Sequence, residues 1–241
     1  MPKRAKTPSS VSTVRSERSR IIIVGDPHVA DRPPIGRVEG YRDQIIDKLV
    51  EVGRLASDCG ADAVVLMGDL YHQPRANLVS HQLVQRLIGV FRNYPCPIYT
   101  ILGNHDLGEE GVASVPRQPI GVLAAANVLS ILWEPLGVGH FTLIPRHYDD
   151  ARNCDPAYYA LTDAEKSLVR DNQVGVLLAH GSVIPPGQSP PYPHISVDDI
   201  DRSGIKVFVG GHIHDNLGIV RLEDGSHFVN LGSLGRTARK R

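Results

Sequence analysis

The sequence has few cysteines, no long apolar run and no excess of charge of either sign. Cys59, Cys96 and Cys154 are scattered, and none has the CxxC spacing of a thiolate metal or redox site. An odd, sparse count argues against a disulfide framework and favours a reducing compartment. The sequence therefore predicts a cytoplasmic, intracellular protein.

The absence of other features excludes further classes. The longest apolar stretch, VLAAANVLSILW, is shorter than the roughly 20 residues of a membrane span. The basic amino terminus lacks the apolar run of a secretory signal. Net charge is 0, so no overall field draws the chain to nucleic acid or membrane. An aromatic content of 5% gives no evident stacking platform for single strands.

Positive charge is concentrated at the two ends of the 241-residue chain. Residues 1–20 hold six Lys or Arg and one Glu, and the last six residues hold Arg236, Arg239, Lys240 and Arg241. Such ends are either disordered, solubilising tails or segments that touch phosphate backbones. Between them lies enough chain for one well-packed domain. We expect a basic tail at 1–19, a domain at 20–236 and a basic tail at 237–241.

Strand and helix patterns alternate along the first half of the domain. RIIIVGD, AVVLMGD and CPIYTILGNHD read as buried strands. Apolar residues at helical spacing predict a helix over 40–58 and another over 77–91, the second with Asn77 as its cap. This alternation indicates a parallel sheet with right-handed crossovers. The first half is therefore of the α/β class.

The second half has a less regular pattern. QVGVLLAHG, IKVFVGGHIH and HFVNLGS are three further strands, and VIPPGQSPPYPH is expected to be a surface loop. Residues 108–160 show no clean period and receive no assignment. There is no internal repeat.

Polar side chains follow five of these six strands. The segments are GDPH (Asp26, His28), GDLYH (Asp69, His72), GNHD (Asn104, His105, Asp106), AHG (His180) and GHIH (His212, His214). Taken singly, each reads as a turn, a cap or a satisfied core histidine. Because sites in α/β sheets form at the carboxyl ends of strands, the five together predict one site.

The chemistry of this set points to two metal ions. Carboxylates, imidazoles and one amide suit Mn²⁺, Fe or Zn²⁺ better than Ca²⁺. The candidate ligands are seven: Asp26, His28, Asp69, Asn104, His180, His212 and His214. Seven is too many for one open catalytic ion but suits two ions that share a carboxylate. Two such ions are most needed for phosphoester hydrolysis.

These five blocks resemble the calcineurin-like metallophosphoesterases over roughly residues 21–235. The resemblance implies a four-layered sandwich in which helices flank two mixed β-sheets, with two divalent ions, most readily Mn²⁺. It implies that Asp69 bridges the ions, that the first ion is bound by Asp26, His28 and His214, and the second by Asn104, His180 and His212. It also implies that His105 stabilises or protonates the reacting phosphate, with Asp106 orienting its ring.

GDLYH, PIYTILGNHD and NLGSLGR further resemble the Mre11/SbcD-type DNA-repair nucleases. That branch implies that His72 positions the scissile phosphate; the alternative is a structural histidine. Ser233 and Arg236 could hold a backbone phosphate, although Arg236 could equally begin the tail. Pro27, inside the first block, is a departure that we interpret as fixing the turn.

The leading hypothesis is a DNA exo- or endonuclease of repair or recombination, for which the same resemblance implies a homodimer. Nucleases of that branch usually continue into a capping region that contacts DNA and a segment that binds an SMC-like ATPase; we expect neither here, which puts an SMC-like ATPase partner in doubt. The second hypothesis is a phosphoesterase for small substrates such as cyclic nucleotides, nucleotides or phosphoproteins. The third is a non-catalytic scaffold, which the complete ligand set argues against.

Overall fold

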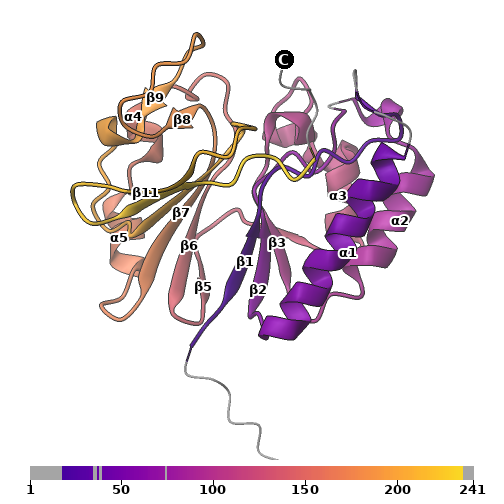
Figure 1. Cartoon of the computed structure of the whole chain (residues 1–241), viewed down its shortest axis with the longest axis horizontal. Helices are drawn as coiled ribbons and strands as arrows, with labels where there is room; N and C mark the ends of the chain where they lie inside the picture. Colours follow the sequence, from indigo (N-terminus) through magenta and orange to yellow (C-terminus); the bar gives the residue numbers. More distant parts are fainter. Residues whose placement is uncertain (1–17, 35–36, 38–39, 74, 236–241) are drawn as a thin grey trace, which may run out of the picture.

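Two β-sheets packed face to face form the centre of the molecule. The structure, a computed structural model, describes residues 18–34, 37, 40–73 and 75–235. The predicted tails therefore lie almost entirely outside the described residues, as does Arg236. Helices cover the outer face of one sheet, and helices with a small third sheet cover the other (Figure 1). The predicted four-layered α/β architecture is confirmed.

The first sheet is built from the first half of the chain and is parallel throughout. Its order is β1 (Ile21–Val24), β2 (Ala63–Leu66), β3 (Ile98–Thr100) and β4 (Ser130–Ile131). The crossovers contain α1 (Tyr41–Cys59), α2 (His81–Phe91) and α3 (Pro119–Ala125), which lie together on one side (Figure 1). Sequential parallel strands bring their carboxyl ends to one edge.

The second sheet is mixed and comes from the second half. Its order is β11 (Gly218–Arg221), β12 (His227–Asn230), β10 (Val207–Gly211), β7 (Val174–His180), β6 (Phe141–Arg146) and β5 (Leu136–Val138). The four central strands are parallel, and β5 and β11 are antiparallel edges. β6, β7, β10 and β12 therefore end at a common edge, as β1 to β3 do.

Short elements fill the remaining layer and loops. They are α4 (Pro156–Tyr159), α5 (Asp163–Leu168), a two-stranded sheet of β8 (Val183–Ile184) and β9 (Ile195–Ser196), and the 3₁₀ turns η1 (Ala76–Leu78), η2 (Asn104–Asp106), η3 (Val112–Arg117) and η4 (Val197–Asp199).

Strand alternation divides the apolar residues into three cores. In β2, Val64 and Leu66 pack against the helices, whereas Val65 faces the second sheet. In β7, Leu177 faces the outer layer and Leu178 faces the first sheet. Both faces of each sheet are thus buried, which explains the nearly continuous apolar runs.

The helices follow their predicted patterns with two differences. Leu55 belongs to the apolar pattern that predicts α1, yet it is 52% exposed. The second helix begins at 81 and not at 77, because the Ser80 side chain accepts the backbone N–H of Leu83 at 3.1 Å, while Asn77 lies in η1. Within the described part of the chain, none of the helices has the length and hydropathy of a membrane span.

The expected surface loop at 183–194 is only partly a loop. Its first residues form β8, and Val183 and Ile184 are each 1% exposed. They pair with Ile195 and Ser196 and close the outer core of the second sheet. Val183 and Ile184 form a strand despite the loop-forming residues that follow, because burying these two apolar side chains stabilises that conformation.

Candidate metal centre

The loops that follow the strands bring the predicted residues of both sheets to one place. The first sheet supplies Asp26 and His28 after β1, Asp69 after β2 and Asn104 after β3. The second supplies His180 as the last residue of β7, and His212 and His214 just beyond β10. Residues separated by up to 188 positions thus meet where the two sheets adjoin.

Two groups of side chains that share one carboxylate could each hold a metal ion, and His28 forms a third such group with His72 and His105. The first ligand group is Asp26, His28, Asp69 and His214, and the second is Asp69, His180 and His212. Within each, one ligand atom per residue lies within 4.8 Å of all the others. Asn104 adjoins the second group, with its Oδ1 3.3 Å from His180 Nε2 and 3.1 Å from His212 Nδ1.

Asp69 lies between the two ligand groups, and its two carboxylate oxygens have different surroundings. Oδ1 accepts the backbone N–H of His105 at 2.8 Å. Oδ2 lies 3.6 Å from His28 Nε2 and 3.5 Å from His180 Nε2. One oxygen is therefore fixed by the backbone, and the other faces a histidine from each group.

Other hydrogen bonds orient the remaining side chains. His180 Nδ1 lies 2.7 Å from the Met67 carbonyl oxygen and donates to it, so Nε2 is the ring nitrogen that faces Asp69. Asp26 Oδ2 accepts the backbone N–H of His212 at 2.8 Å. This bond joins the first strand loop to the last one.

The backbone here adopts conformations that side chains usually avoid. Among the described residues, the non-glycine residues at positive φ are His28 (47°), Asp69 (49°), Asn127 (54°) and His212 (77°). Each such residue costs roughly 1–3 kcal/mol. Three of the four belong to the candidate site, so the fold is strained where these side chains converge.

Gly103 leaves the space that the cluster occupies. A Cβ at this position would lie 2.1 Å from Asp69 Oδ1 and 2.6 Å from His180 Cε1. A glycine is therefore required before Asn104 because the packing is close, and not because of the backbone conformation, since φ of Gly103 is −96°.

Buried charges oppose one another in this cluster. Burial raises the pKa of Asp26 to about 7, against the attraction of His180. Burial also favours the neutral form of Asp69, but the neighbouring His180 and His28 outweigh it and lower the pKa of Asp69. Burial likewise opposes a proton on His180, but the charge of Asp69 outweighs it and raises the pKa of His180. A proton on His180 thus supplies positive charge that a cation could supply instead.

The side chains present fit divalent cations. Asp26 Oδ1 and His28 Nδ1 are buried and have no hydrogen-bond partner among the described residues. The Nε2 atoms of His28 and His214 lie 2.8 Å apart; that of His28 is 3.6 Å from Asp69 Oδ2, and that of His214 is 3.9 Å from Asp26 Oδ2. Nitrogen and oxygen donors without a thiolate are the set that Mn²⁺, Fe and Zn²⁺ accept.

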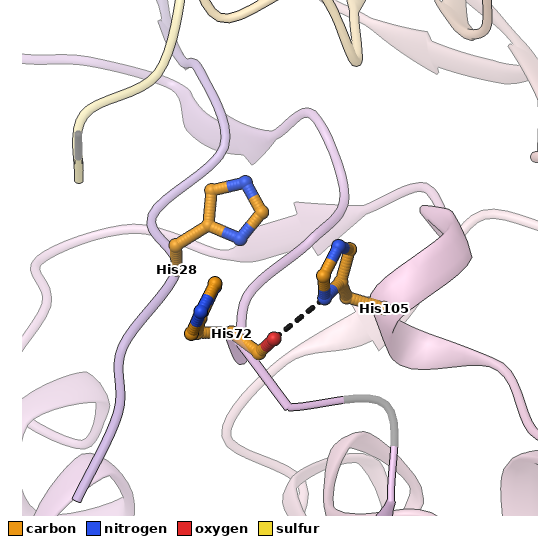
Figure 2. A group of neighbouring side chains, drawn as sticks. All are labelled: His28, His72 and His105. Atoms are coloured by element: carbon orange, nitrogen blue, oxygen red, sulfur yellow. Dashed lines mark hydrogen bonds between the residues drawn. The ribbon is translucent and has the colours of Figure 1, made fainter. Parts of the chain in front are cut away.

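His72 and His105 lie beside the first ligand group (Figure 2). Their rings stack with centroids 5.6 Å apart, and both meet the ring of His28 edge-on, at 5.6 and 5.1 Å. His105 Nδ1 lies 2.6 Å from the His72 carbonyl oxygen, so it donates there and Nε2 is left for another partner.

Asp106 does not orient the His105 ring as predicted. It is buried, and its carboxylate accepts the backbone N–H groups of Asp69 (2.7 Å), Leu70 (3.1 Å) and Gly103 (3.0 Å). Asp106 therefore ties the loop after β2 to the loop after β3, and the His72 carbonyl takes the orienting role.

Ser233 follows β12 and lies against the His214 loop. Its backbone N–H donates to the His214 carbonyl at 3.2 Å, and its Oγ is buried without a partner among the described residues. Arg236, predicted to act with it, lies outside the described residues.

Tyr148 is a site residue that no motif indicated. Its ring centroid lies 5.6 Å from that of His212 and 6.2 Å from that of His180. Its backbone N–H donates to the Leu102 carbonyl at 2.8 Å, which ties the end of β6 to the loop after β3. RHYDD follows a strand as the other blocks do, but that strand was not predicted.

Comparisons with known proteins identify a family and show similar folds. The family model described as calcineurin-like phosphoesterase matches residues 19–216. A dimetal phosphatase from Danio rerio has a similar fold, with a TM-score of 0.59, 10% identity and coverage of 89% of this chain and 87% of that one. A protein of Thermus thermophilus follows with a TM-score of 0.54, 15% identity and coverage of 90% and 91%. No curated protein sequence matches the chain.

Proposed function

This chain belongs to the calcineurin-like phosphoesterase family, whose reaction is metal-dependent phosphoester hydrolysis, and on that premise we propose that it is a two-metal phosphodiesterase. In this proposal the first ligand group binds one cation. The second group, with Asn104, binds the other. Two ions held together would activate a water and clamp the oxygens of an in-line displacement.

The observation that carries the proposal is the position of Asp69. Its Oδ2 faces a histidine of each group at 3.5–3.6 Å, while its Oδ1 is held by the His105 backbone. A carboxylate fixed in this way suits a bridge between two ions. The similar fold of a protein named as a dimetal phosphatase supports the same arrangement.

His105 is the residue that we assign to the phosphate oxygens. Its Nδ1 is occupied by the His72 carbonyl, so Nε2 is the atom that can donate a hydrogen bond or a proton. The ring meets His28 edge-on, which places it beside the first ligand group and not among the ligands of the second.

We propose DNA as the substrate because His72 in GDLYH lies beside His28 and His105. An imidazole there could position a scissile phosphodiester within a strand. The basic chain ends favour a polyanionic substrate as well.

A small phosphoester is the second candidate, and one feature of the surface favours it. The groove that starts at Asn104 carries the acidic residues Glu109, Glu110, Asp149 and Asp150 against one basic residue, Arg152. Such a groove opposes a continuous phosphate backbone.

The test is a Mn²⁺-dependent activity profile of the purified protein. We expect hydrolysis of bis-p-nitrophenyl phosphate and of linear DNA, abolished by a chelator and restored by Mn²⁺. Preference for p-nitrophenyl phosphate over the diester would exclude a nuclease. Absence of metal-dependent hydrolysis of every ester would refute the proposed function.

Two variants and a matched control make the test specific. Asp69→Asn should lose activity by removing the shared carboxylate, and His105→Ala should lower kcat by about 10²–10⁴-fold. His81→Ala, an exposed histidine at the start of α2, should leave both metal binding and kcat unchanged. Equal rates for His105→Ala and His81→Ala would remove His105 from the reaction.

A further inference from the structure

A groove of about 590 Å³ begins at the second ligand group and runs across residues that no motif assigned. Asn104 and Tyr148 form its inner end, and both also lie against the histidines of that group. A molecule whose phosphate sits at the metal centre could therefore extend directly into this groove.

Aromatic rings line the groove. Trp133, the one tryptophan of the chain, is 52% exposed although its side chain is large and apolar. Its ring meets that of His147 edge-on, with centroids 5.0 Å apart. The Tyr158 ring is covered by the Arg152 guanidinium at 4.2 Å. Because His147 supports one side of the indole, Trp133 presents aromatic surface to whatever enters.

The charges of the groove are predominantly negative. Arg152 is engaged by Asp149, with Nη2–Oδ2 at 2.6 Å and Nε–Oδ2 at 2.8 Å. Glu109, Glu110 and Asp150 add three more carboxylates to the lining, of which Glu110 is paired with Arg117. Phosphate groups are thus disfavoured beyond the metal centre, whereas an uncharged flat ring is not.

Resting on the proposed function, we propose that this groove binds the nucleoside part of the substrate, with its base stacked on Trp133 and no further phosphate beyond it. The substrate class is then a nucleotide ester whose nucleoside in the groove is terminal. For DNA, this means a strand end and not an internal position.

The single tryptophan allows a direct binding test. Adenosine monophosphate, added to the Mn²⁺-loaded His105→Ala protein to limit turnover, should change Trp133 fluorescence. Glycerol phosphate carries the same phosphate but no ring and should leave it unchanged. An equal response to both would overturn the proposal, because phosphate at the metal centre alone would then explain the signal.

Competition kinetics supply a second readout. Stacking of one base contributes about 1–3 kcal/mol, which corresponds to roughly 5- to 150-fold in affinity. Trp133→Ala should raise the inhibition constant of adenosine monophosphate by that factor, and Trp133→Phe should restore most of it. The inhibition constant of glycerol phosphate should stay the same in all three proteins, and a parallel rise would overturn the proposal.

The acidic lining is tested with adenosine 3′,5′-bisphosphate, which carries a second phosphate on the nucleoside. Its inhibition constant should be higher than that of adenosine monophosphate, and Glu109→Gln should bring the two inhibition constants closer together. Equal inhibition by the two nucleotides would overturn the exclusion of further phosphates. Loss of all Mn²⁺-dependent hydrolysis would instead refute the proposed function, so the two failures are distinct.

Discussion

Replacing Arg146 with methionine should cost the protein about 3–5 kcal/mol of its stability. Arg146 and Glu165 are 10% and 15% exposed and form a bidentate pair with two contacts of 2.8 Å. The same guanidinium donates to the carbonyls of Tyr158 (2.7 Å), Ala160 (2.8 Å) and Pro145 (3.0 Å). Its removal leaves a half-buried carboxylate and several carbonyls without a partner.

The assay is urea unfolding followed by circular dichroism. For a chain of this size the loss corresponds to a Tm lower by roughly 6–20 °C. Arg146→Met/Glu165→Gln should be more stable than Arg146→Met, because no unpaired charge remains. The control is Arg117→Met, whose partner Glu110 and own side chain are 65% and 64% exposed, with an expected loss below about 1 kcal/mol. A similar small loss for Arg146→Met would refute the reasoning.

Three further outcomes are expected. Partial burial would raise the pKa of Glu165, but the hydrogen bonds from Arg146 outweigh it and lower that pKa in the folded protein. The ionised Glu165 therefore contributes its full stabilisation above pH 4.5, and this contribution is lost as the pH falls further. Acid titration of wild type against Glu165→Gln checks this, and a constant difference down to low pH would contradict it. Gly103→Ala should abolish hydrolysis by displacing Asp69, whereas Gly89→Ala, in open space on α2, should retain activity and add about 0.5–1 kcal/mol of stability. Mn²⁺ at 100 times its Kd should stabilise wild type by about 2.7 kcal/mol, measured as a Tm increase, and Asp69→Asn should lose that increase.

The sequence predicted the architecture well where its patterns were long. Seven-residue β7 and the helix over 41–59 carry enough residues to show their period. Residues 108–160 fold into elements such as β4 and α4, of two and four residues, which are too short for any period. Their conformation is set by tertiary contacts, as when Arg146 fixes the Tyr158 and Ala160 carbonyls.

For the site, the motif residues were predictable because each lies at the carboxyl end of a strand or in the loop that follows it. The seven predicted ligands do converge, with Asp69 in both groups. The groove was not predictable, since Trp133, Tyr148 and Tyr158 come from segments without a motif. The His72 carbonyl, which orients the His105 ring, was not predictable either, because a backbone carbonyl is present at every residue and gives no sequence pattern.

The division of the chain between its two sheets has a consequence for assembly. The first sheet ends at Ile131 and the second begins at Leu136, so the exposed Glu134 separates two sequential halves. Neither half contains all the residues of either ligand group, since the first half supplies the shared aspartate and the second supplies His180, His212 and His214. Bound ions would act as cross-links between them. Two fragments cut at this junction would rebuild the two ligand groups only by reassociating, so uptake of two ions would report their reassociation.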